Sequence, residues 1–385
     1  MIIIQQELLA RGIGFMKNNS LIPFPIDNEN PILAGVMYGF SRQSVPQFFL
    51  AWKQWRKFVT CMLSSKRGRI FFSTFLAKGS QTVWGDFERS EFTGYQNLEY
   101  FFDAHVTRID LTLDASGNLK ILDPNVMPYG ITPLIASQEI LGINSHLPYL
   151  ETLSSTKGTW VADKTHGGAA SIKWLTERAG IEFSYTEDFK KADYVIRQTR
   201  KNVFGQKKTI NQVGIRMFES QLWSALMNIP NLGESFGFKV DMPLHRKNCT
   251  PTYLLKFEKE KILIAHSFQN NELAWISFDD FSSLFWDPSF SSVFLKSIFT
   301  SGCHQVTFSD FKENRIKKAI REKLGNGEFF LLQPAIPCSV DNERIRIASY
   351  VGANGQHYGT EVTRVPLSCM LAHGGEHAKI SYLEI

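Results

Sequence analysis

The pattern of hydrophobic positions predicts a long amphipathic helix near the start of the chain. Between Pro46 and about Leu63, large apolar residues such as Phe48, Trp52 and Val59 recur at the spacing of one helical face. An aromatic stripe of this kind is typical of a face buried in a core. The apolar run that follows, from Arg69 to Leu76, predicts a buried strand.

A clearer pattern follows after residue 100. The segment Thr107 to Asp114 alternates polar and apolar residues at period two, as a half-buried strand does. A turn-forming run, Asp114-Ala-Ser-Gly-Asn, separates it from a second strand, Leu119 to Asp123. Together these segments predict a β-hairpin.

The stretch from about 155 to 245 has the rhythm of strand, helix and strand. The expected strands are Thr159–Asp163, Ile181–Tyr185 and Ala192–Arg197, and the expected helices are Ala169–Arg178, ended by Gly180, and Met217 to about Met227. Such alternation predicts a small parallel α/β unit.

The last stretch mixes strands and one charged helix. The expected strands are Thr252–Lys256, Ile262–Ala265, Val293–Lys296, Phe329–Gln333, Ile345–Val351 and Thr360–Val365, and the helix is Phe311–Leu324. We therefore expect an α+β protein with three regions, 1–150, 151–245 and 246–385.

Composition supports a globular chain and narrows its partners. Hydrophobic residues make up 43% and charged residues 21%, which is ordinary for a folded domain. The net charge of +5 suits an anionic small molecule such as a nucleotide but is too small to predict nucleic-acid binding. The basic residues between Lys53 and Arg69 fit a solvated helix face.

The cysteines and the N-terminal residues indicate the cellular compartment in which the protein is expected. The five cysteines are odd in number, widely spaced and without a CxxC pair, so neither a disulfide framework nor a zinc site is expected. Reduced thiols fit a cytoplasmic protein. We expect no signal peptide and no membrane partner, because the N-terminus lacks a basic region and no run of 18 apolar residues occurs.

The hairpin carries the strongest chemical signal. Residues two apart on a strand share a face, so Arg108 lies beside Asp110, and Asp123 beside Asn125. If the strands pair in register, two carboxylates and an amide oxygen converge, which are ligands that suit Mg²⁺. The alternative interpretation is an ordinary surface hairpin with an Arg–Asp pair.

The whole run from Arg108 to Gly130 resembles the metal-binding hairpin of ATP-grasp ligases. It is most similar to the circularly permuted branch that includes glutathionylspermidine synthetase, in which an Arg-x-Asp strand precedes a Glu-x-Asn strand. The resemblance implies an ATP-grasp fold in permuted order with a small pre-ATP-grasp-like α/β unit. It also implies Mg²⁺ held by Asp110, Asp123 and Asn125, with Arg108 on the transferred phosphoryl group.

Later segments resemble the nucleotide-binding parts of the same family, in the permuted order. The run Val293 to Val306 is similar to the strand and loop that cover ATP, which implies phosphate contacts from Lys296, Ser301 and Gly302. Phe329 to Gln333 resembles the hinge strand, which implies that Gln333 lies at the adenine. The alternating arginines Arg346 and Arg364 are expected to point into the same cleft, toward phosphate or the substrate carboxylate.

Two departures from the family pattern are visible. Asp123 replaces the usual Glu, and Gln221 stands where the family usually has a first nucleotide-binding lysine. Lys256 could supply the missing charge, although it also fits an ordinary exposed strand lysine. The alternative function is therefore a catalytically silent relative that binds nucleotide or a partner protein.

The resemblance implies a two-step reaction. ATP would phosphorylate a carboxylate, and an amine would then attack the acyl phosphate to form an amide or peptide bond. Small carboxylates and amines are the expected substrates. A weaker possibility is a modifier of peptides or proteins, with the Lys53–Arg69 segment as a docking face.

Overall fold

The structure is a computed structural model of the chain. It describes residues 4–17, 20–41, 43–75, 106–114, 116–125, 131–155, 158–162, 169–185, 194–196, 209–210, 221–284, 293–298, 305–308, 312–324, 328–334, 339–340, 342–352, 355–367 and 377–384.

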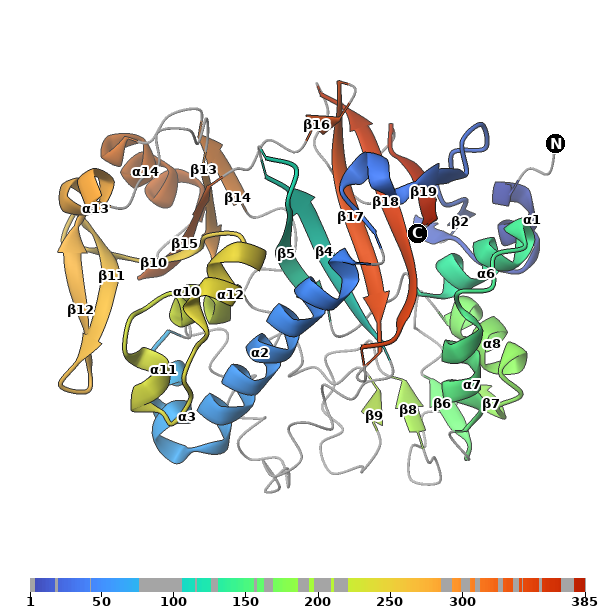
Figure 1. The fold of residues 1–385 in the computed structure, drawn as a ribbon, viewed down its shortest axis with the longest axis horizontal. Helices are drawn as coiled ribbons and strands as arrows, with labels where there is room; N and C mark the ends of the chain where they lie inside the picture. The colour runs from blue at the N-terminus through green and yellow to red at the C-terminus, as the bar shows by residue number, and fades with distance from the viewer. Residues whose placement is uncertain are drawn as a thin grey trace.

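A seven-stranded sheet lies at the centre of the molecule and takes strands from distant parts of the chain (Figure 1). The strands lie in the order β3, β19, β18, β17, β4, β5, with the short β16 paired to β17. Their bounds are β3 Ile32–Ala34, β4 Thr107–Leu113, β5 Leu119–Asn125, β16 Ser339–Val340, β17 Glu343–Val351, β18 His357–Pro366 and β19 Lys379–Glu384. The pairs are antiparallel except β3 with β19. The predicted hairpin, β4–β5, is confirmed.

Different helices cover the two faces of this sheet. On one face Ile109, Leu111 and Ile347 are buried in a cluster with α2 (Ser44–Ser64), the aromatic helix expected from the sequence. On the other face Tyr350 and Tyr382 lie in a cluster with α6 (Ile131–Leu141), α7 (Leu147–Ser154) and α1 (Ile4–Ala10). Successive residues alternate between these faces, so the polar residues that share a face with Tyr350 lie on the α6 side.

A second sheet has six antiparallel strands, in the order β12, β11, β10, β15, β13, β14. Their bounds are β10 Tyr253–Glu258, β11 Lys261–Gln269, β12 Glu272–Ser277, β13 Val293–Ser297, β14 Gln305–Phe308 and β15 Phe329–Pro334. One face is covered by α13 (Phe278–Leu284) and α14 (Glu313–Ala319), which continues as a π-helical turn, Ile320–Leu324. The strands predicted between 252 and 333 are confirmed. Residues 246–385 thus supply strands to both large sheets.

The parallel strand pairing predicted for the stretch after residue 155 is also confirmed. Four parallel strands lie in the order β7, β6, β8, β9. Their bounds are β6 Trp160–Ala162, β7 Phe183–Tyr185, β8 Tyr194–Ile196 and β9 Thr209–Ile210, and the helix α8 is Ala169–Arg178.

The prediction of a strand after residue 69 is wrong, because Lys66–Ser73 is the helix α3. Ser65 caps its start by accepting a hydrogen bond from the Gly68 backbone N–H at 2.9 Å. The buried face holds Phe72, stacked on Trp223 with ring centroids 4.3 Å apart. A short apolar run fits a strand or a buried helix equally well, and the capping serine decides for the helix.

Two arginines of the basic segment 53–69 make hydrogen bonds within the fold. Arg69 donates to the carbonyls of Leu63 and Ser64 at the end of α2, at 3.0 and 3.2 Å. Arg67 donates to the Ser235 carbonyl at 3.2 Å and lies over the Phe236 ring. These two arginines therefore serve the structure, as basic residues near helix ends often do.

Short elements complete the described chain. They are β1 Phe15–Lys17, β2 Ser20–Ile22, the 3-10 helix η1 Gly35–Tyr38, α10 Leu222–Met227, α11 Leu232–Ser235 and α12 Met242–Asn248. Within the described ranges, no helix has the length and apolar character needed to cross a bilayer.

Candidate active site

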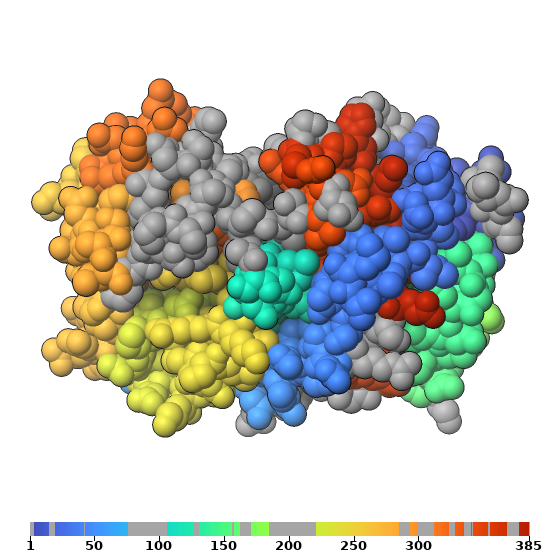
Figure 2. Space-filling model, turned by 45° about the horizontal axis from the view of Figure 1, so that its top comes forward, coloured from blue at the N-terminus to red at the C-terminus, as the bar shows by residue number. Residues whose placement is uncertain are grey.

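The β4–β5 hairpin places its polar residues opposite one another. Arg108 lies opposite Asn125, and Asp110 opposite Asp123. A bulge after the Asp110–Asp123 pair leaves Leu122 as an extra residue on β5. Because opposed residues of antiparallel strands share a face, these four side chains converge. In Figure 2 the hairpin, in teal, lies between the yellow helical segment and the red strands.

Asp110 is the centre of the charged groups on this face. It is only 5% exposed, and Arg108 binds it through two hydrogen bonds, from Nε to Oδ1 at 2.8 Å and from Nη2 to Oδ2 at 3.0 Å. The Asn125 Nδ2 also donates to Oδ2 at 3.3 Å, and Nη1 of Arg346 lies 3.9 Å from the same oxygen. Such two-point arginine–carboxylate contacts are among the stronger hydrogen-bonded pairs.

A second buried carboxyl group, Glu361, is not indicated by the local sequence pattern. It lies on the same row of the sheet as Asp110, with Ala348 between them, and accepts a hydrogen bond from the Tyr350 hydroxyl at 3.4 Å. Burial raises the pKa of Glu361 to about 7, although Arg108 and Arg346 oppose this shift. The alternation of Thr360 to Arg364 was visible in the sequence, but the register that brings Glu361 to Asp110 was not.

The same buried surroundings also shift the pKa of Arg108. Burial alone would lower the pKa of its guanidinium, but the carboxylate of Asp110 and its neighbours raise that pKa above the ordinary value. Arg108 therefore stays charged while it is largely removed from water. A buried charge of this kind is costly unless it is paired, which is the condition that Asp110 meets.

Lys296 reaches this region from the second sheet. Its Nζ donates to Oε1 of Gln333 at 2.8 Å and to Oε1 of Gln221 at 3.1 Å. Burial lowers the pKa of Lys296 to about 8, and the carboxylate of Asp123 opposes the shift. The hairpin and the lysine strand are thus in electrostatic contact.

Gln221 connects the two sheets directly. Its Nε2 donates to the carbonyl of Leu122, the bulge residue of the hairpin, at 2.8 Å, while its Oε1 accepts from Lys296. The residue that departs from the family pattern therefore lies beside the lysine. Because the Gln221 side chain is a neutral amide, the positive charge of the Gln221–Lys296 pair comes from Lys296.

Gln333 differs from its expected role in one respect. Its side chain is 1% exposed, with Oε1 accepting from Lys296 and Nε2 donating to the Thr252 hydroxyl at 3.2 Å. Both ends of the amide are therefore used within the protein. An adenine contact from this strand would have to come from its backbone rather than from this side chain.

Lys256 lies on the same face of the second sheet as Lys296, since both strands pair with β15 in that register. Its Nζ is 3.0 Å from Glu258 and 3.3 Å from Glu328. The hydrogen bond to Glu258 is the main cause that raises the pKa of Lys256. Surface glutamates thus compensate its charge, which favours the interpretation as an ordinary strand lysine.

The expectation that Arg346 and Arg364 point into one cleft is wrong. Arg346 pairs in register with Thr363, so it shares a face with Glu361 and Asp110, whereas Arg364 is one residue further and lies on the opposite face. There Arg364 binds Asp27 at 2.5 Å and Glu343 at 3.3 Å. Its charge is used in a separate ion-pair network.

Two predicted residues, Ser301 and Gly302, lie outside the described residues. Among the described residues, no group of three or more His, Cys, Asp or Glu side chains could hold a metal ion. The predicted magnesium site therefore depends on the two aspartates of the hairpin together with the Asn125 amide.

Comparisons with known proteins leave the family open. No protein-family model matches the sequence, and no curated protein matches it with significant similarity. Among solved structures, the chain matches the crystal structure of a provisionally assigned gamma-glutamylcysteine synthetase from Methylobacillus flagellatus KT. The TM-score is 0.43 and the identity 10%, over 75% of this chain and 84% of that one. A likeness at this level assigns neither a family nor an activity, so the resemblance to glutathionylspermidine synthetases stays a prediction.

Proposed function

We propose that the chain is an ATP- and Mg²⁺-dependent ligase that joins a carboxylate to an amine through an acyl phosphate. The observation that carries the proposal is the meeting of Lys296 with the hairpin. A partly buried lysine from one sheet lies within electrostatic reach of Asp123 in the other sheet. A cation facing carboxylates across two sheets is suited to hold a metal–nucleotide complex.

The donor set fits Mg²⁺ in its chemistry. Asp110 and Asp123 lie directly opposite each other and Asn125 is next to them on the same face, which gives hard oxygen ligands with few protein groups, as Mg²⁺ usually has. Asp110 at present accepts from Arg108 and Asn125. These donors would have to move aside, so metal binding should free Arg108 to meet a phosphate.

When bound, Mg²⁺ would offset the charge of the ATP phosphates. In the first step a carboxylate oxygen of the substrate attacks the γ-phosphorus, the bond to the β-phosphate oxygen breaks, and ADP leaves. In the second step the amine nitrogen attacks the acyl carbon, phosphate leaves and the amine loses a proton. Arg108 and Arg346 would stabilise the transferred group, and Lys296 the ATP phosphates, because such reactions depend on positioning and charge stabilisation.

The first test is Asp123→Ala. We expect ADP release from ATP, measured with pooled carboxylates and amines in the presence of Mg²⁺, to fall by about a hundredfold or more, since a charged group at the reacting phosphates is lost. Undiminished turnover by this variant would contradict the assignment.

A matched control comes from the same hairpin. Asp114 lies in the turn, where its carboxylate accepts from the backbone N–H groups of Ser116 and Asn118. Asp114→Asn keeps an oxygen acceptor and removes one negative charge, so it should retain activity within about twofold. Equal losses in both variants would indicate a general charge effect or damage to the hairpin.

The second candidate is a silent nucleotide-binding relative. The observation that favours it is the neutral Gln221 beside Lys296, at a place where the family usually supplies a second cation. Wild-type protein that binds an ATP analogue but releases no ADP with any of the pooled substrates would support this alternative over the ligase.

A further inference from the structure

A cavity of about 450 Å³ lies beside the site, where the second sheet divides. Strand β10 pairs with β11 only from Leu255 onward, although it pairs with β15 from Tyr253. Over the same stretch β11 stays paired with β12, and it contains a bulge between Ala265 and Ser267. The two strands therefore separate at their ends, and residues of α10 and α12 line the cavity there.

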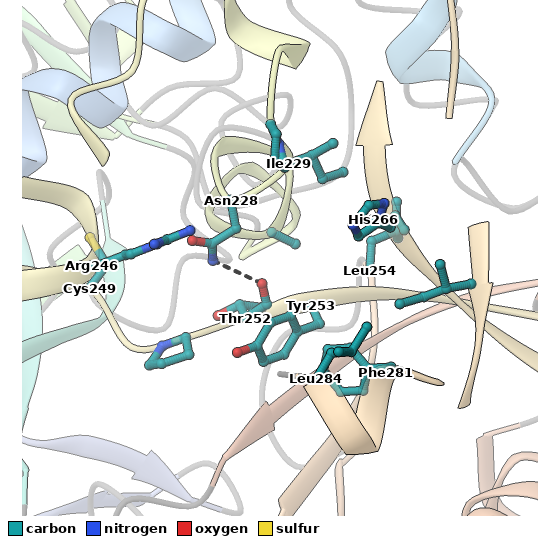
Figure 3. A pocket seen from close by; sticks show the side chains of 15 residues that line it. Asn228, Ile229, Arg246, Cys249, Thr252, Tyr253, Leu254, His266, Phe281 and Leu284 are labelled. Atoms are coloured by element: carbon teal, nitrogen blue, oxygen red, sulfur yellow. Dashed lines mark hydrogen bonds between the residues drawn. The ribbon is translucent and has the colours of Figure 1, made fainter. Parts of the chain in front are cut away.

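The lining combines an apolar body with polar groups at one side. Tyr253, Leu254, Ile276 and Phe281 supply aromatic and aliphatic surface. Figure 3 shows Asn228 and Arg246 on one side of the pocket, with the Arg246 side chain extending toward Asn228, and His266 on another. The volume and the mainly apolar lining with a few polar groups are typical of small-molecule sites.

The charge of this lining is one-sided. It includes Arg246 but no Asp or Glu among the residues that the structure describes there. Arg246 is exposed, and it makes no ion pair with a carboxylate of the described chain. The neighbouring Cys249 does not add a negative charge, because burial raises the pKa of its thiol to about 12.

We propose that this cavity binds a small organic carboxylate with an aromatic or branched aliphatic body. The apolar part would lie against Tyr253, Leu254 and Phe281, and the carboxylate would lie at Arg246. A guanidinium can bind a carboxylate through two parallel hydrogen bonds. The Asn228 side chain, which already donates from Nδ2 to the Thr252 carbonyl at 3.0 Å, borders the same end.

The cavity is joined to the proposed catalytic lysine through Thr252. The Thr252 hydroxyl accepts from Gln333 Nε2, and Gln333 Oε1 accepts from Lys296. Because the cavity wall itself includes Thr252, an occupant would touch the residue that orients Gln333. The binding proposal is nevertheless independent of the ligase proposal, since it concerns different residues and needs no nucleotide.

The test uses the full chain without ATP or Mg²⁺, with 3-phenylpropionate as the probe and 3-phenylpropionamide as its neutral counterpart. Calorimetric titration should show saturable one-to-one binding of the acid, at least about tenfold tighter than the amide, as expected for one charged hydrogen-bonded contact. No saturable binding of the acid, or equal affinity for acid and amide, would overturn the proposal.

Two exposed substitutions locate the binding. Arg246→Gln should weaken binding of the acid by about tenfold or more and abolish the preference over the amide. Lys247→Gln is the matched control, because Lys247 is the next residue on α12, is also exposed and does not line the cavity. Equal effects of the two substitutions would mean that the acid responds to the general positive charge of α12, and would reject the cavity as its site.

A third variant tests the apolar end. Leu284 is 72% exposed at the edge of the lining, so Leu284→Asp should not disturb the core. A carboxylate there should repel the acid and leave the neutral amide nearly unaffected. Binding of the acid that is unchanged in this variant and in Arg246→Gln would place it elsewhere on the protein.

Discussion

At the scale of single residues, burial decides which charges the site can use at a given pH. Lys296 is surrounded by amide groups, and its pKa lies at about 8 because desolvation outweighs the opposing effect of Asp123. It is therefore mostly charged at pH 7 and mostly neutral at pH 9. Arg108, paired with Asp110, keeps its charge throughout this range.

The pH dependence of nucleotide binding follows from Lys296. If its ammonium group holds ATP phosphates, the affinity for an ATP analogue should be about tenfold lower at pH 9 than at pH 7, because the charged fraction falls by that factor. Asp123→Asn removes the charge that favours the ammonium form, so the loss of affinity should begin at a lower pH. Titration by calorimetry across this range checks both; an affinity independent of pH would exclude Lys296 from the phosphates.

His245 predicts a stability effect of known sign. Burial lowers its pKa to about 4, against an ordinary value of 6.5. Between these values the unfolded chain binds more protons than the folded chain, so this residue makes the protein less stable as pH falls through that window. From pH 7.5 to pH 5 the expected loss is about 2 kcal/mol.

Glu361 acts in the opposite direction, because its raised pKa favours the folded state at low pH. The effect of His245 is therefore measured as a difference between variants. In urea unfolding at pH 7.5 and pH 5, His245→Gln should lose about 2 kcal/mol less than the wild type. The same loss of stability in His245→Gln and in the wild type would contradict this role of His245.

How much the sequence can predict differs between the hairpin and its surroundings. Local alternation and a turn motif were sufficient for the hairpin itself, because neighbouring strands of a hairpin fix each other's register. The pairing of Asp110 with Asp123 also needs the bulge at Leu122, which the local pattern does not specify. The face on which Arg364 lies depends on its pairing with β17 and β19, which local pattern does not specify. Glu361 was missed for the same reason, since its partners come from strands far along the chain.

At the scale of elements, α3 shows how two local contacts choose a helix over a strand. Ser65 caps its first turn, and Gly68 lies so close to the end of α2 that a Cβ there would be 2.0 Å from the Met62 carbonyl oxygen. The helix therefore turns sharply out of α2, and its Phe72 reaches Trp223 of α10, the helix that begins beside Gln221.

Substitutions in this turn should lower the free energy of unfolding by different amounts. Ser65→Ala should lower the free energy of unfolding by about 1 kcal/mol through loss of the cap. Gly68→Ala should cost more, because the backbone of α2 would have to move. Ser64→Ala is the control, since the exposed Ser64 side chain donates to the Thr60 carbonyl within α2. Urea unfolding measures all three, and an effect of Ser64→Ala as large as that of Ser65→Ala would contradict the capping role.

At the scale of the whole molecule, the sheet that carries the hairpin is completed by the last strand. In β19, Ile380 and Tyr382 are buried on the α6 side, the face that also holds Asp110. Their packing supports β18 and β17, to which β4 is paired. Stability at the site thus depends on residues that do not touch it.

This dependence predicts a distant effect. Ile380→Ala should lower the free energy of unfolding by about 2–4 kcal/mol, as cavities in cores do, and should also increase amide hydrogen exchange in β4. Lys379→Ala, at an exposed neighbouring position, should change neither. Hydrogen exchange in β4 that does not respond to Ile380→Ala would mean that the hairpin is held independently of β19.

The ion pair between Asp27 and Arg364 joins residues 337 positions apart, and this has a consequence for synthesis on the ribosome. The described strands of the second sheet all lie between residues 253 and 334, so this sheet can assemble once they have emerged. The hairpin must wait for β17 and β18, which are translated much later, with one edge of β4 unpaired. Contacts of such sequence separation form slowly and leave strand edges open to aggregation. We therefore expect the newly made chain to depend on chaperones more than the finished protein would suggest.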